Sequence, residues 1–227
     1  ILEDWNIKPW FVDGVCIIMD CAGTEYERMG LVDQSLTSEV IEIPFFRDIG
    51  FRCPIHRIDH HYAHTLSFWP MKVKPNIHFV FDGFGDDWMY RSVWRDGKLI
   101  DYGKTPSGVD IMKHGSPSLG FILSRMGATL RLGGNYLDQA GKIMALKAFG
   151  QHNPDVNCQD IHIDSLDRMW DFLLIEQHIN DQQYLIDYIH TAHEYTEQIY
   201  LKHFQKFVEP DDIVGYSGGV AQNTIIN

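Results

Sequence analysis

Three segments of strand character separated by two turns constrain the fold of this chain more than any other feature. They are Asn76–Phe81, Trp88–Trp94 and Lys98–Lys104, and the dipeptide Asp96-Gly97 lies between the last two. Asp-Gly between alternating runs is a strong signal for a tight β-hairpin. We therefore predict a three-stranded antiparallel meander, with the acidic, glycine-rich turn at residues 82–87 forming the tip of its first hairpin.

Further strands and helices are predicted on both sides of this meander, which indicates an α/β fold. Apolar runs of strand length occur at Phe11–Met19, Val40–Phe46 and Asp212–Tyr216. Asp59 is suited to cap the N-terminus of a helix that begins directly after it. Apolar residues at helical spacing predict further helices at Leu119–Leu130, Leu137–Ala148, Leu166–Glu176 and Tyr184–Val208.

Composition narrows the class of function. The chain has 227 residues, of which 44% are hydrophobic, and 19 Lys+Arg against 31 Asp+Glu give a net charge of −12. This charge argues against nucleic acid as a partner and favours small-molecule chemistry. No apolar run reaches the ~20 residues of a membrane-spanning helix, so no membrane partner is expected. The four cysteines form no CxxC pair, which is typical of reduced thiols in a cytoplasmic protein.

The two ends of the chain indicate a fragment of a longer protein. The sequence opens at Ile1, and it stops at Asn227, where the helix predicted after the last glycine turn has barely begun. We therefore expect sequence to be missing on both sides.

A histidine cluster follows the predicted cap. His60 and His64 are four residues apart, so on a helix their side chains share a face, with Cβ atoms about 5–6 Å apart. This spacing lets both imidazoles reach one metal ion, and His61 is the alternative partner of His64. No HExxH glutamate is present and no third ligand is evident, although a catalytic metal usually has three. The competing interpretation is ordinary hydrogen-bonded helix histidines.

The acidic turn is suited to a phosphate. Asp82 ends an apolar strand, and Gly83 and Gly85 allow a ligand to approach the backbone. A carboxylate beside a phosphate normally acts through Mg²⁺, because two anions repel each other. An acidic hairpin turn without a ligand is an equally good interpretation of these residues alone.

A second glycine turn follows the predicted strand near the C-terminus. Gly218 and Gly219 allow a nucleoside to pack against the backbone, and Asn223 lies one helical turn later. A strand-to-helix turn without a ligand is the alternative. Gly141-Lys142 is not a P-loop, because Ile143 occupies the Ser/Thr position, but the amino group of Lys142 is a candidate to neutralise phosphate.

Five motifs in unbroken order carry a family resemblance over about residues 50–227: HHYAH, DGFGDD, SLGFILSRMG, GKIMALKAFG and SGGVAQN. Together they resemble the NodU/CmcH family of O-carbamoyltransferases, whose first domain is similar to the tRNA threonylcarbamoyl-transfer protein. The resemblance implies the actin-like ATPase fold, with two ribonuclease-H-like lobes of mixed sheets and flanking helices. Residues 1–75 would then be the remainder of the first lobe, including the histidine helix. Residues 76–227 would form the second lobe, truncated at its C-terminus.

The resemblance also implies an activity. In that family carbamoyl phosphate and ATP give carbamoyl-adenylate, and an acceptor hydroxyl then takes the carbamoyl group and releases AMP. His60 and His64 match the positions that hold iron. Residues Asp82 to Asp87, including Asp86, match the phosphate loop, and Gly218, Gly219 and Asn223 match the nucleoside turn. The family's third metal ligand is an aspartate beyond Asn227, and its adenylate-forming domain has no match here.

Two departures from the family pattern bear on the acceptor. The family usually reads GKxMGLAPYG, whereas this chain has Ala145, Lys147, Ala148 and Phe149, and Gln222 replaces the usual leucine. The expected partners are carbamoyl phosphate and a hydroxyl-bearing small molecule, with a second copy of the chain as a further candidate. Two alternatives stay open: a sugar-kinase-like phosphotransferase of the same superfamily, and a member that binds nucleotide without turnover.

Overall fold

The computed structural model describes residues 7–18, 38–41, 44–106, 109, 111 and 115–223. These residues form a mixed α/β structure with two sheets. The first sheet has the order β1-β3-β2, from β1 (Val15–Ile18), β3 (Ile55–Ile58) and β2 (Ser38–Ile41). Strand β3 runs parallel to β1 and antiparallel to β2. A 3-10 turn, η1 (Pro9–Phe11), and a short helix, α2 (Pro44–Asp48), flank this sheet.

The second sheet contains the predicted meander. Its strands are β4 (Ile77–Phe81), β5 (Met89–Arg95) and β6 (Lys98–Lys104), and β7 (Val214–Ser217) pairs parallel to β4 to give the order β6-β5-β4-β7. Asp96 and Gly97 both have positive φ angles, 49° and 74°, as a two-residue type I′ hairpin turn requires. The meander and the Asp-Gly turn are therefore confirmed.

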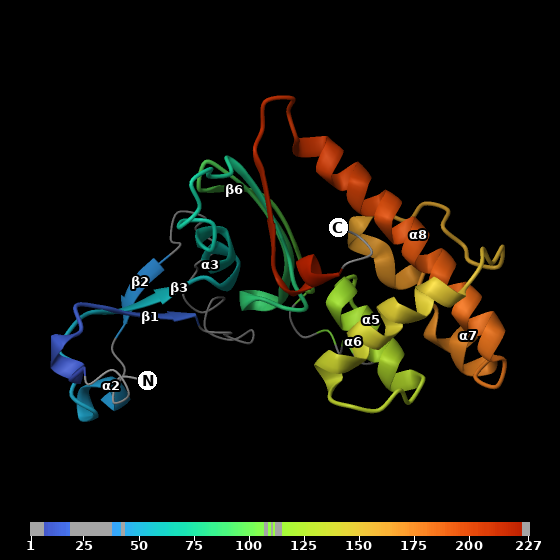
Figure 1. The fold of residues 1–227 in the computed structure, drawn as a ribbon, viewed down its shortest axis with the longest axis horizontal. Coiled ribbons are helices and arrows are strands. Elements are labelled where there is room, and N and C mark those ends of the chain that lie inside the picture. Colours follow the sequence, from blue (N-terminus) through green and yellow to red (C-terminus); the bar gives the residue numbers. More distant parts are fainter. Residues whose placement is uncertain are drawn as a thin grey trace.

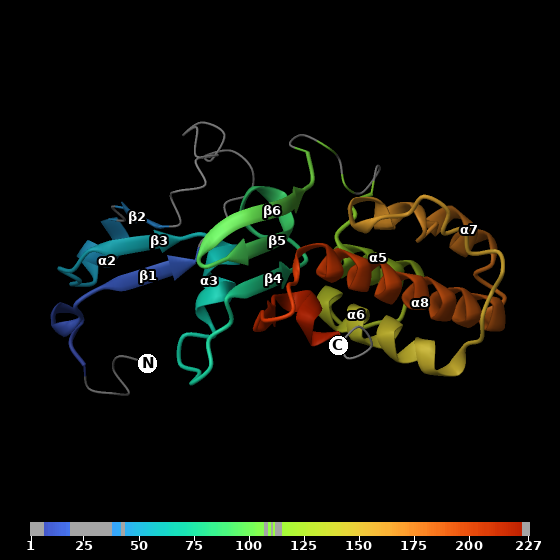
Figure 2. The ribbon, with the colours of Figure 1, turned by 90° about the horizontal axis from the view of Figure 1, so that it is seen from above.

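Helices cover both faces of the second sheet (Figures 1 and 2). The 3-10 segments are η2 (Asp86–Trp88), η3 (Lys147–Phe149), η4 (Ile163–Arg168) and η5 (Gly219–Gln222). The α-helices are α3 (His60–Leu66), α5 (Leu119–Thr129), α6 (Tyr136–Leu146), α7 (Phe172–Gln177) and α8 (Gln182–Phe207).

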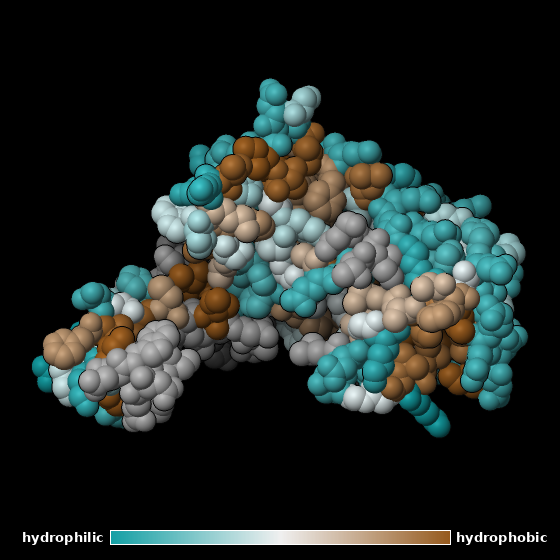
Figure 3. Space-filling model, in the orientation of Figure 1, coloured by the Kyte–Doolittle hydropathy of each residue, from teal (hydrophilic) through white to brown (hydrophobic). Residues whose placement is uncertain are grey.

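The core lies between the second sheet and helices α5 to α8. Phe79 and Phe81 of β4 stack on α8, with ring centroids of Phe79 and Phe204 4.1 Å apart and those of Phe81 and Tyr200 4.6 Å apart. Asp181 caps α8. The apolar residues of α8, which recur at helical spacing, are buried against the sheet. The opposite side of α8 is hydrophilic in Figure 3. Helix α3 packs on the other face of the same sheet, against β4, β5 and β7.

Three strand and helix predictions need correction. The predicted strand Val40–Phe46 ends at Ile41, and Pro44 starts α2, because proline suits the first turn of a helix. The strand predicted at Phe11–Met19 is confirmed over Val15–Ile18 only, and Met19 lies outside the described residues. The helix predicted at Leu166–Glu176 is split into η4 and α7, because Asp171 caps a new helix. Strand β3 was not predicted.

The structure locates the histidine helix on the second sheet. The family resemblance places the histidine helix in the first lobe, residues 1–75. In the structure this helix, α3, contacts strands β4, β5 and β7, which lie in the residues expected for the second lobe. The division of the chain after residue 75 stays a prediction. Among the residues that the structure describes, no helix combines the length and the apolar character needed to cross a membrane.

Candidate functional site

The histidine pair is placed by a helix cap. Strand β3 ends at Ile58, and the side chain of Asp59 accepts a hydrogen bond of 2.8 Å from the backbone N–H of Tyr62. This is the N-cap bond expected from the sequence, and it starts α3 at His60. Because four residues complete about one helical turn, His60 and His64 point from the same face of α3. Their ring centroids are 4.8 Å apart.

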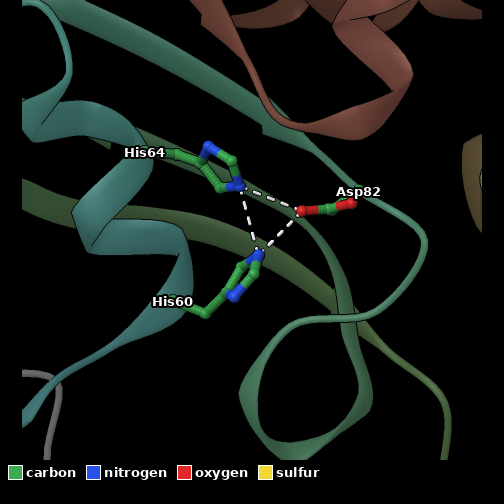
Figure 4. Close-up of side chains that lie close together, drawn as sticks. All are labelled: His60, His64 and Asp82. Atoms are coloured by element: carbon green, nitrogen blue, oxygen red, sulfur yellow. Dashed lines mark hydrogen bonds and ion pairs between the residues drawn. The ribbon is translucent and has the colours of Figure 1, made fainter. Parts of the chain in front are cut away.

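A third residue, Asp82, joins the two imidazoles (Figure 4). Its Oδ2 lies 2.8 Å from Nε2 of His60 and 3.0 Å from Nε2 of His64, and the two Nε2 atoms are 3.1 Å apart. The other carboxylate oxygen accepts a hydrogen bond of 2.7 Å from the N–H of Gly83, which fixes the orientation of the carboxylate. No other group of three His, Cys, Asp or Glu side chains within the described ranges converges in this way.

These three atoms cannot all be joined by hydrogen bonds. Three short contacts need three protons, but each neutral imidazole offers at most one proton at Nε2, and an ionised carboxylate offers none. Burial raises the pKa of Asp82, but the hydrogen bonds from His60 and His64 lower it by a larger amount. The pKa of this carboxyl therefore lies well below the usual range, and the group is ionised. At least one contact of the triangle therefore has no hydrogen bond, whereas a cation between the three atoms would satisfy all of them.

The arrangement fits a divalent transition metal. Two histidines and one carboxylate on one face of the ion form the ligand set of many non-haem iron sites. Ligands about 2.1 Å from a metal and at right angles to one another are separated by about 3 Å, which is the spacing of this triangle. The side chains of His60, His64 and Asp82 are 24%, 30% and 18% exposed, so one side of the group is open to ligands.

The acidic turn is held by helix α5. Ser118 caps α5 and its hydroxyl oxygen lies 2.5 Å from the carbonyl oxygen of Gly83 and 3.1 Å from that of Asp82. A Cβ atom on Gly120 would lie 2.9 Å from Cα of Gly83, so the first turn of α5 is in direct contact with the acidic turn. The N–H groups at this helix N-terminus form a partially positive region beside the carboxylates.

The C-terminal glycine turn meets the same carboxylate. Because β7 runs parallel to β4, with Ser217 opposite Val80, the chain leaves both strands at the same edge of the sheet. Gly218 has φ of 97°, and a Cβ atom there would collide with the carbonyl oxygen of Phe81. A Cβ atom on Gly219 would lie 2.8 Å from Oδ1 of Asp82. The histidine pair, the acidic turn and the glycine turn are therefore neighbours.

Other predicted site residues have different positions. Asp86 is buried, and its carboxylate accepts a hydrogen bond of 3.3 Å from the backbone N–H of His60. Asn223 is buried directly after η5. The amino group of Lys142 donates to the carbonyls of Leu132 and Gly133, at 2.9 and 2.8 Å. The phosphate role of Lys142 stays a prediction.

Sequence reasoning missed the contact between Asp82 and the histidines and the role of Ser118. Asp82 was a candidate for phosphate, and no third ligand was found for a metal. The available signal was its position at the end of the strand that follows the histidine helix. Ser118 had a local signal, since serine directly before an apolar helical run is a typical cap.

Comparison with known proteins gives one distant structural likeness. No protein-family model matches the sequence, and no curated protein matches it. Among solved structures, the chain is similar to component A of (R)-2-hydroxyglutaryl-CoA dehydratase from Acidaminococcus fermentans, with 16% identity and a TM-score of 0.42. The match covers 73% of this chain and 54% of that chain, so this chain spans about half the length of that protein. Because the likeness is so distant, the actin-like fold and the carbamoyl chemistry are proposals.

Proposed function

We propose that this chain carries the metal-binding and nucleotide-binding part of an ATP-dependent O-carbamoyltransferase. One observation carries the proposal: the triangle of His60, His64 and Asp82 has more short polar contacts than protons to fill them, and it lies against the turn at Gly219. A divalent cation beside a glycine turn is suited to a phosphorylated ligand, because the cation neutralises the charge of phosphate.

The metal site would hold Fe(II) or another divalent ion. His60 and His64 would bind it through Nε2 and Asp82 through Oδ2. When bound, the ion supplies a Lewis acid for phosphate or carbonyl oxygen atoms. The cap bond of Asp59 fixes the start of the helix that carries both histidines, and the hydrogen bond from the N–H of Gly83 fixes the carboxylate of Asp82.

The nucleotide would lie along the two glycine turns. The backbone of Gly83 is open on one side, since a Cβ atom there would have no neighbour within 4 Å, and Gly83 lies against the first turn of α5. A helix N-terminus favours bound phosphate. Mg²⁺ would accompany ATP, since the carboxylates of the acidic turn repel phosphate without it.

The carbamoyl step is proposed from the order of the five motifs. Carbamoyl phosphate, water and ATP would give carbamoyl-adenylate, phosphate and pyrophosphate, and the carbamoyl group would then replace the proton of an acceptor hydroxyl with release of AMP. The chain's own contribution is to hold the adenylate and the acceptor in position, which is a large part of the catalysis of acyl transfer. A cytoplasmic location agrees with the free thiols of Cys16, Cys53 and Cys158.

The metal assignment is tested by titrating the protein with Co²⁺ or, without oxygen, Fe²⁺ in a calorimeter. We expect one ion per chain, lost in the double variant His60→Ala/His64→Ala and weakened at least tenfold in Asp82→Asn. The matched control is the double variant His152→Ala/His190→Ala, which removes two histidines that both contact the carboxylate of Glu194 in α8. Equal binding by the native protein and the His60/His64 double variant would refute the site.

The reaction is tested on the full-length protein. With ATP, labelled carbamoyl phosphate and a panel of hydroxyl acceptors, we expect AMP and a carbamoylated product. Formation of ADP with a phosphorylated acceptor would indicate the phosphotransferase alternative. Binding of ATP with neither product would indicate a nucleotide-binding protein without turnover.

A further inference from the structure

We propose that His61, between the two metal-binding histidines, is a positioning residue that sets the distance between helix α3 and the acidic turn. This inference rests on the proposed metal site, since that site needs His60 and His64 of α3 within reach of Asp82. The side chain of His61 points into the protein and is 0% exposed.

One edge of the His61 ring is tied to the second sheet. Its Nδ1 lies 2.8 Å from Oγ of Ser92, a fully buried residue of β5. The same oxygen accepts a hydrogen bond of 2.7 Å from the indole N–H of Trp94. Because an indole only donates, the Ser92 oxygen is an acceptor in that bond, and its own proton is available for Nδ1 of His61. The contact is directional, so it fixes the rotation of α3 on the sheet.

The opposite edge of the ring touches the acidic turn. A Cβ atom on Gly85 would lie 2.7 Å from Nε2 of His61 and would collide with Cδ2. The backbone of Gly85 thus lies directly against the ring, and its N–H donates to the carbonyl of Met89 at 2.6 Å, which closes the turn. Gly85 is three residues from Asp82, so the ring determines how near the turn comes to α3.

A second buried histidine shows why this arrangement differs from ordinary core packing. His193 is also 0% exposed, but its Nδ1 bonds to the carbonyl of Ile189 in its own helix, at 2.8 Å. That bond lies within α8 and connects it to no other helix, strand or turn. The His61 ring instead lies between a strand and a turn, and its helix carries the two imidazoles of the triangle. Residues that orient metal ligands in this way typically change metal affinity 10–100-fold when they are replaced.

The test measures Co²⁺ affinity and the visible absorption of the bound ion. We expect His61→Leu to bind one Co²⁺ about 10–100-fold more weakly than the native protein, with a changed absorption spectrum. His61→Asn keeps a polar atom near the position of Nδ1 and should recover part of the affinity. The control His193→Leu loses a comparable buried ring, and its thermal stability should fall while affinity and spectrum stay unchanged.

A second pair of variants keeps the test decisive if His61→Leu fails to fold. Ser92→Ala removes the bond to Nδ1, and Gly85→Ala introduces the collision with the ring; each should weaken Co²⁺ binding. Gly85→Ala should also be less harmful when combined with His61→Asn, because the smaller side chain leaves room for the new methyl group. Native affinity and an unchanged spectrum in His61→Leu, or in both Ser92→Ala and Gly85→Ala, would overturn the inference. Failure of the metal site itself is recognised separately, because the native protein and His60→Ala/His64→Ala would then bind Co²⁺ alike.

Discussion

Gly219 lies against the carboxylate of Asp82, so that a Cβ atom at residue 219 would come within 2.8 Å of Oδ1. These residues are 137 positions apart, and they meet because β7 pairs parallel to β4. The same carboxylate contacts both imidazoles through its other oxygen. The position of Asp82 therefore couples the candidate nucleotide turn to the candidate metal site.

Gly219→Ala should disturb the metal site without unfolding the protein. The new methyl group would push the Asp82 carboxylate away, and an overpacked site of this kind costs about 1–3 kcal/mol. We expect Co²⁺ to bind about tenfold more weakly, since one ligand is displaced. Calorimetric titration gives the affinity, and circular dichroism confirms that the fold is kept.

Gly141→Ala is the matched control for this change. Gly141 lies within α6, and a Cβ atom there would have no neighbour within 4 Å. Alanine in a helix interior is more stable than glycine by about 0.5–1 kcal/mol, so the control should gain stability and bind Co²⁺ normally. Native Co²⁺ affinity in Gly219→Ala would show that the contact with Asp82 has no consequence.

The parts of the fold that sequence reasoning identified have local signals. The hairpin at Asp96-Gly97 follows from turn chemistry, and the helix after Asp59 follows from its cap. Strand β3, with the sequence Ile-His-Arg-Ile, has little apolar pattern of its own. It forms by pairing with β1, whose partner residues are about 40 positions away, and such pairing leaves no local trace in the sequence.

The same difference applies to the candidate site. Helical spacing is enough to show that His60 and His64 share a face, and the structure confirms it. That Asp82 completes the group depends on how α3 packs on β4, which the spacing of residues does not reveal. Nor does the spacing of residues reveal where Lys142 lies: its amino group bonds to the carbonyls of a neighbouring loop, and its role at phosphate stays a prediction.

Asp59→Ala should weaken the helix that carries the histidines. The carboxylate of Asp59 bonds to the N–H of Tyr62, and loss of an N-cap costs about 1 kcal/mol. Urea denaturation should show this loss. Asp59→Asn should retain most of the stability, because an asparagine oxygen accepts the same bond. Equal destabilisation in both variants would mean that the cap bond is not the cause.

Arg91→Met should destabilise the second sheet on the face opposite to α3. The guanidinium of Arg91 bonds to both carboxylate oxygens of Asp164, at 2.6 and 2.7 Å, and also to Asp101. Its side chain is 5% exposed, whereas that of Asp164 is 39% exposed and partly solvated. Removing one partner of a buried ion pair costs about 3–5 kcal/mol, and the exposure of Asp164 reduces this to about 2–3 kcal/mol.

Urea denaturation with a surface control measures the effect of Arg91. The control is Arg131→Met, at an exposed position between α5 and α6, where a change within about 0.5 kcal/mol is expected. A loss below about 1 kcal/mol in Arg91→Met would show that the two aspartates are solvated well enough to tolerate its absence.

Stability should fall as the pH decreases below about 6.5, because α8 contains buried neutral histidines. Burial lowers the pKa of His193 to about 4, against about 6.5 for an unfolded chain. Between these values the unfolded state binds a proton that the folded state does not, so the free energy of unfolding decreases as the pH falls. At pH 5 this amounts to about 2 kcal/mol for His193. His203, with a pKa lowered by burial to about 4, should contribute similarly.

The variant His193→Phe separates this contribution from the rest of the protein. Phenylalanine cannot bind a proton and keeps an aromatic ring against Trp170, whose centroid is 5.0 Å from that of His193. The decrease in the free energy of unfolding between pH 7 and pH 5 should therefore be about 2 kcal/mol smaller in the variant. Between pH 7 and pH 8 the unfolded histidine loses only its last fraction of a proton, so the pH dependence of the two proteins should differ there by no more than about 0.2 kcal/mol. An identical decrease between pH 7 and pH 5 would mean that His193 takes up its proton equally in the folded and unfolded states.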